Sequence, residues 1–135
     1  MKRTNPCRRI AVALAFFFSN LAVAATFEDE SITIGLNTYP IDHQGPQVID
    51  LEVVLQFVPG IADKDYPEVT EIKGRIEKLL VGYPNETDWW EIFNKRVAAA
   101  LLAAYPMAER VSFTVNLHPT RDIPYRNRYH CVARR

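Results

Sequence analysis

A carboxylate and an imidazole flank the most regular stretch of this sequence, and both could do chemistry. Glu91 lies in the first turn of a predicted helix, where the positive end of the helix dipole suits a negative charge. His118 ends a predicted strand and is an acid–base group near neutral pH. A carboxylate can accept two parallel hydrogen bonds and an imidazole can transfer protons, so this pair carries most of the functional signal.

Glu91 also has a purely structural interpretation. Asp88 precedes it by three residues, which is the spacing of a capping box. Under that interpretation the glutamate would only close the start of the helix. Trp89 and Trp90 could stack on a flat ring, although at helical spacing at least one of them belongs to the core.

The histidines do not indicate a metal site. His43, His118 and His130 are single and scattered along the chain. Zinc sites use clustered histidine or cysteine ligands, so a metal site built from one chain is not expected.

A helix and a strand between residues 87 and 119 would position the pair. In the first half, apolar residues recur at three- and four-residue steps, as a helix with one apolar face requires: Trp90, Phe93, Val97, Leu101 and Ala104. In the second half, apolar residues alternate with polar ones, as in a half-buried strand: Val111, Phe113, Val115 and Leu117. Tyr105-Pro106 separates the two elements.

The rest of the chain adds three strands and another helix. Alternation predicts strands over residues 31–37, 48–58 and 125–135, and the two prolines and one glycine of 38–47 predict a loop. A helix is expected over 65–80, with Asp65 as N-cap and Pro67 in its first turn. The order β-β-α-α-β-β predicts an α+β fold, a four-stranded antiparallel sheet with both helices on one face. Apolar residues on the polar side of the second strand predict self-association through the other face: Val48, Val54 and Val58.

Residues 1–24 have the pattern of a secretory signal peptide. Four basic residues precede an apolar run from residue 10 to residue 25, and Ala22-Val23-Ala24 supplies small residues for cleavage. The run is shorter than the roughly 20 residues of a membrane anchor. We therefore expect a single domain over residues 25–135 in the periplasm or outside the cell, with no membrane attachment after cleavage.

The charge and cysteine content of the mature chain narrow its partners. Cleavage removes four of the 16 basic residues and none of the 16 acidic ones, which leaves a formal net charge of −4. Nucleic acid is therefore not an expected partner, because phosphate binding needs a basic face. Cys131 is left without a second cysteine, and we expect a small buried thiol, with an intermolecular disulfide as the alternative.

Several short motifs resemble the dihydroneopterin aldolase and epimerase family of the tunnelling fold. That group shows Asp-Tyr before the first helix, here Asp65-Tyr66, and a Leu-Ile-Glu-x-Leu-x-x-Arg-Ile-Ala start to the second helix, here residues 89–98. A Val-x-Val-x-Lys-Pro sequence closes its third strand, here 115–119. The resemblance covers nearly all of the mature chain.

The resemblance implies a pterin site between the subunits of a ring-shaped oligomer, a tetramer or larger. Glu91 matches the glutamate that anchors the 2-amino and N3–H edge of the pterin, and Tyr66 matches a tyrosine that reaches the site from a neighbouring subunit. Trp90 is a candidate to stack on the ring, and no cofactor is implied.

Two departures from the family affect the expected activity. His118 stands where the family has a lysine that assists proton transfer. His43 and Gln44 fall about where the family has a loop glutamate. We therefore expect an exported protein that binds a pterin or purine-like heterocycle, without standard aldolase activity. Two alternatives stay open: an aldolase or epimerase that uses His118 as acid–base group, and a structural or partner-binding oligomer in which Glu91 is only a cap.

Overall fold

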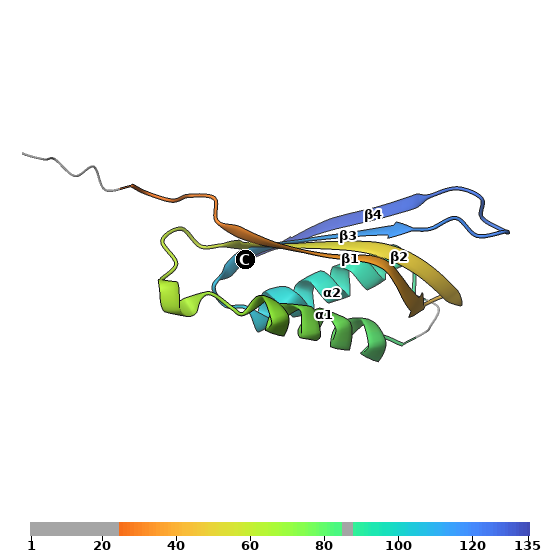
Figure 1. Ribbon diagram of the computed structural model, residues 1–135, viewed down its shortest axis with the longest axis horizontal. Helices are drawn as coiled ribbons and strands as arrows, with labels where there is room; N and C mark the ends of the chain where they lie inside the picture. The colour runs from red at the N-terminus through yellow and green to blue at the C-terminus, as the bar shows by residue number, and fades with distance from the viewer. Residues whose placement is uncertain (1–24, 85–87) are drawn as a thin grey trace, which may run out of the picture.

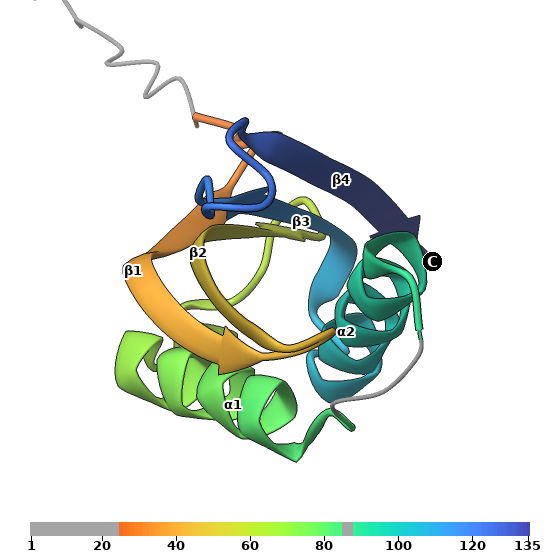
Figure 2. The same ribbon diagram turned by 90° about the vertical axis from the view of Figure 1, so that its right-hand side faces the viewer.

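The computed structural model describes residues 25–84 and 88–135. The predicted signal peptide lies outside the described residues. Seven elements follow in chain order: β1 (Ser31–Asp42), β2 (Pro46–Phe57), the 3-10 turn η1 (Asp63–Asp65), α1 (Val69–Gly82), α2 (Trp90–Ala104), β3 (Ala108–Leu117) and β4 (Asn127–Arg134). The strands form one antiparallel sheet in the order β1-β2-β3-β4. Both helices pack on one face of this curved sheet, as Figures 1 and 2 show. The expected α+β fold is confirmed.

The core lies between the sheet and the helices because the predicted alternation holds on the central strands. Ile49, Leu51, Val53, Leu55 and Phe57 of β2 are all buried, and so are Val111, Phe113, Val115 and Leu117 of β3. α2 contributes the apolar face that its spacing predicts, from Trp90 through Phe93 to Leu101. Within the described residues, no helix combines the length and apolar character needed to span a membrane.

The predicted loop over residues 38–47 is mostly strand, so that prediction was wrong. β1 continues to Asp42, with a register shift between Leu36 and Tyr39 and a left-handed Thr38 at φ 53°. Pro40 fits because β1 is an edge strand, where a residue without an N–H is tolerated. The turn itself is confined to residues 43–45, between β1 and β2.

The first helix also starts later than predicted. α1 begins at Val69 after Glu68, so Asp65 is not its N-cap and Pro67 lies before its first turn. A proline restricts the residue before it to extended backbone, and Tyr66 is extended at φ −67° and ψ 126°.

The C-terminal end of α2 is closed by a residue far along the chain. The guanidinium of Arg135 donates hydrogen bonds to the carbonyl oxygens of Leu102, Tyr105 and Ala108, the last at 3.0 Å. A cation beside the carbonyls that end a helix is favourable for the helix dipole. The C-terminal end of α2 is therefore fixed by a tertiary contact.

Candidate functional site

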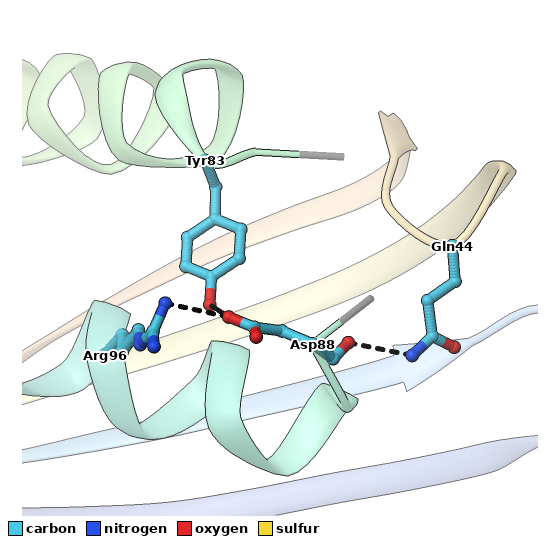
Figure 3. A network of polar contacts seen from close by, with 4 residues as sticks. All are labelled: Gln44, Tyr83, Asp88 and Arg96. Atoms are coloured by element: carbon cyan, nitrogen blue, oxygen red, sulfur yellow. Dashed lines mark hydrogen bonds and ion pairs between the residues drawn. The ribbon is translucent and has the colours of Figure 1, made fainter. Parts of the chain in front are cut away.

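The start of α2 is held by a polar network around Asp88 (Figure 3). The Asp88 carboxylate accepts hydrogen bonds from the Tyr83 hydroxyl at 2.7 Å and from Nη1 of Arg96 at 2.8 Å. The Asp88 carbonyl oxygen accepts one from Nε2 of Gln44, at the β1–β2 turn, at 2.8 Å. Burial and the Asp88 charge both raise the pKa of Tyr83, so the phenol keeps its proton. This network fixes where the first turn of α2 lies.

The capping box that the sequence allowed does not form. Trp89 is the N-cap of α2, no side chain caps the helix, and the Asp88 carboxylate is engaged by Tyr83 and Arg96 instead. Glu91 is exposed in the first turn and makes no hydrogen bond or ion pair with any described residue. Its carboxylate is therefore available to a ligand.

Glu91 lies on a cavity of about 300 Å³ between α2 and the edge strand β4. α2 contributes Glu91, Asn94 and Lys95, and β4 contributes residues 128–131. Burial raises the pKa of Tyr129, and the nearby Glu91 charge raises it further. The Tyr129 phenol therefore keeps its proton at neutral pH. The cavity thus combines a carboxylate, a basic side chain and an aromatic ring.

Asn94 is a polar residue of this cavity that the sequence interpretation missed. It is 1% exposed, and neither its Oδ1 nor its Nδ2 makes a hydrogen bond within the described chain. The signal was present in the sequence: Asn94 interrupts the apolar face formed by Trp90, Phe93 and Val97.

The fourth strand brings Cys131 to the same cavity. The residue is half-buried and packs against the core, as expected for a small thiol in the last strand. Burial raises the pKa of the thiol, an effect that Lys95 partly offsets. The thiol therefore keeps its proton at neutral pH.

His118 lies in a different place, on the helix-free face of the sheet. Its Nε2 is 2.9 Å from Oδ1 of Asp50, which also accepts a hydrogen bond from the backbone N–H of Thr38 at 2.9 Å. Both contacts lower the pKa of Asp50 below its usual value, and the hydrogen bond from the Thr38 N–H has the larger effect. His118 lines a separate cavity of about 470 Å³, together with Thr38, Val48 and neighbouring residues.

His43 and Trp90 are part of the core. His43 is 1% exposed, and its ring centroid lies 4.6 Å from that of Trp90, 5.0 Å from Phe93 and 5.5 Å from Tyr83. Trp90 is 5% exposed and stacks on Tyr129, whereas Trp89 is 69% exposed. Trp90 is thus the core tryptophan of the pair, and in this conformation neither His43 nor Trp90 offers a ligand much surface.

Tyr66 lies far from the other candidates. It directly follows η1 in the chain, and in Figure 1 η1 and the start of α2 lie toward opposite ends of the long axis. Its ring is about one third exposed, meets Phe57 edge to face, and lines a separate cavity of about 650 Å³. A single chain therefore brings together neither Tyr66 and Glu91 nor Glu91 and His118, and a site containing Tyr66 and Glu91 requires two chains.

The described residues contain no group of three or more histidine, cysteine, aspartate and glutamate side chains that could hold a metal ion.

Comparison with known proteins gives a structural relative but no relative in sequence. No protein-family model matches the chain, and no curated protein matches it. The fold is similar to the crystal structure of a dihydroneopterin aldolase from a Burkholderia species, bound to guanine, with a TM-score of 0.61. The match covers 80% of this chain and 93% of that one at 12% sequence identity. The chain therefore has the tunnelling fold and is structurally similar to dihydroneopterin aldolase.

Proposed function

We propose that this protein is exported and binds a pterin or a purine-like heterocycle, with Glu91 as the anchor and without standard aldolase activity. The observation that carries the proposal is the state of Glu91. The carboxylate lies on a cavity, in the first turn of a helix, and none of its hydrogen-bonding capacity is used by the described chain. A glutamate that served only as a cap would be bonded to the backbone at the helix start.

The chemistry of the cavity suits the proposed ligand class. A carboxylate accepts two parallel N–H hydrogen bonds, which the amino-pyrimidinone edge of guanine or a pterin supplies. The helix N-terminus favours the negative charge that this contact needs. The structural relative was crystallised with guanine, which makes guanine the natural first probe.

Replacement of Glu91 by glutamine tests the proposal. The amide turns one acceptor into a donor that faces the ligand N–H groups, and a charge-assisted bidentate contact is worth about 2–3 kcal/mol. We therefore expect a roughly 30- to 150-fold loss of guanine affinity by calorimetry. The Tm should hardly change, because glutamine is also a good helix former.

Glu52→Gln is the matched control for this experiment. It removes the same charge from the helix-free face of β2, away from the cavity. The proposal predicts guanine affinity equal to that of the wild type in this control. Equal affinity in Glu91→Gln and wild-type protein, or no guanine binding by the wild type, would refute it.

A second candidate function is catalysis by His118, favoured by the carboxylate at its side. An imidazole oriented by a carboxylate is a common acid–base arrangement, and His118 and Asp50 have that contact at 2.9 Å. Incubation with 7,8-dihydroneopterin separates the two candidates. Turnover by the wild type that is lost in His118→Asn supports an enzyme, whereas binding without turnover supports the binding protein.

A further inference from the structure

Asn94 carries an unused hydrogen-bonding capacity that the packing of the chain does not explain. Both polar atoms of its amide are buried and lack a partner among the described residues. A buried amide without hydrogen bonds lowers folding stability. Such violations of local rules are expected at functional sites, where the missing partner is a ligand.

The position of Asn94 links this amide to Glu91. The two residues are three apart on α2, and side chains at that spacing are neighbours on one helix face. Both line the same cavity of about 300 Å³ against β4. Within this lining Asn94 is buried, whereas Glu91 is exposed. A flat ring anchored on the carboxylate would therefore present its adjoining atoms to the amide.

We propose that Asn94 determines ligand specificity by donating a hydrogen bond from Nδ2 to an acceptor that adjoins the edge bound by Glu91. The proposal rests on the proposed function. In guanine, the N1–H and 2-amino edge is flanked by O6 on one side and N3 on the other. Both flanking atoms are acceptors, and the same holds for the corresponding carbonyl oxygen and ring nitrogen of a pterin. The amide therefore finds an acceptor whichever way the ring lies.

Two guanine analogues identify the atom that the amide contacts. 6-Thioguanine keeps the N1–H and 2-amino edge but replaces O6 by sulfur, a weaker acceptor. 3-Deazaguanine keeps that edge and O6 but replaces N3 by C–H. In the wild type, one of the two analogues should bind about tenfold more weakly than guanine, since the loss of one hydrogen bond is worth about that factor.

The variant Asn94→Leu, which keeps the branching of asparagine but has no polar atoms, completes this set of measurements. It should bind guanine about tenfold more weakly than the wild type, and the analogue that wild-type protein discriminates should now bind as well as guanine. Its Tm should be higher, because an unpaired buried amide has been replaced by an apolar side chain. Asn116→Leu, on the helix-free face of β3, is the control and should keep wild-type affinity and discrimination.

The outcomes separate this inference from the proposed function. If wild-type protein binds no guanine, both are wrong. If wild-type protein binds guanine through Glu91 but Asn94→Leu keeps the affinity and the analogue preferences of the wild type, the role of Asn94 is refuted and the function stands. If Asn94→Leu does not fold, Asn94→Ala is measured in the same way, and unchanged discrimination there overturns the inference.

Discussion

Asp50 is the residue for which the structure gives a clear dependence on pH. The Thr38 N–H and the His118 imidazole lower the pKa of its carboxyl in the folded protein. A group with a depressed folded pKa stabilises the protein above its unfolded pKa, and that contribution is lost as the pH falls through the folded value. We expect the free energy of unfolding of the wild type to decline below about pH 4. In Asp50→Asn this decline should be smaller. Urea unfolding between pH 2.5 and 7 measures the free energy of unfolding of both proteins.

Glu52→Gln serves as the comparison for Asp50. Glu52 lies on the same strand and the same face and makes no hydrogen bond or ion pair with the described residues. An identical acid profile in Asp50→Asn and the wild type would show that the contacts of Asp50 contribute nothing to stability.

Individual site residues were only partly predictable from the sequence. The spacing of apolar residues was enough to place Glu91 in the first turn of a helix. Whether Glu91 capped that helix depended on Asp88, whose carboxylate binds Tyr83, at the end of α1, and Arg96, farther along α2. His43 was expected near a ligand because it falls about where the resembled family has a loop glutamate. The extension of β1 carries it instead into an aromatic cluster, and ligand contact by His43 stays a prediction.

At the scale of elements, the Asp88 network should determine how firmly α2 begins. A hydrogen bond from a neutral donor to a charged acceptor contributes about 1.5–3 kcal/mol, and an exposed ion pair contributes at most about 1 kcal/mol. Because the Asp88 side chain is 25% exposed and that of Arg96 is 63% exposed, the Tyr83 contact should dominate. We expect Asp88→Asn to lower the free energy of unfolding by about 1–2 kcal/mol, measured with urea.

A double-mutant cycle assigns that loss to its partner. Tyr83→Phe and Asp88→Asn should be non-additive, since each removes the same hydrogen bond. Additive losses would mean that the two side chains act independently. Asp122→Asn, in the exposed loop after β3, is the control for the loss of a charge.

The loop over residues 38–47 and the start of the first helix were predicted wrongly for local reasons. Residues 38–47 contain Pro40, Gly45 and Pro46, which favour a turn, yet an edge strand can accommodate a proline and the turn needs only three residues. Asp65 and Pro67 are typical of a helix start, but they belong to a 3-10 turn and an extended link before α1. The central strands and α2 were predictable because burial on one face imposes a strict period.

For the whole molecule, we predict a tetramer or larger assembly. β1 and β4 are edge strands of the sheet, so each could pair with a strand of another chain. Val54 and Val132 are apolar residues on the helix-free face, which could pack against another copy. Tyr66 and Glu91 could share a site only across two chains. Sedimentation velocity measures the mass, and a monomer at high protein concentration would exclude a site that contains both.

Export is a second prediction for the whole molecule. The basic start, the apolar run and Ala22-Val23-Ala24 predict cleavage near Ala25. Mass spectrometry of protein from the periplasm of a bacterial host should show a new N-terminus there. Mature protein that still begins at Met1 would contradict this prediction.

The contact between Arg135 and the end of α2 has a consequence for the order of events during synthesis. Arg135 follows Leu102 by 33 positions, and its side chain supplies donors to the carbonyls where α2 ends. The ribosome therefore synthesises all residues of α2 before it adds the residue whose side chain caps the end of this helix. A nascent chain halted before Arg135 should leave the last turn of α2 frayed, and the helix that carries Glu91 should reach its final stability only after β4 has been made.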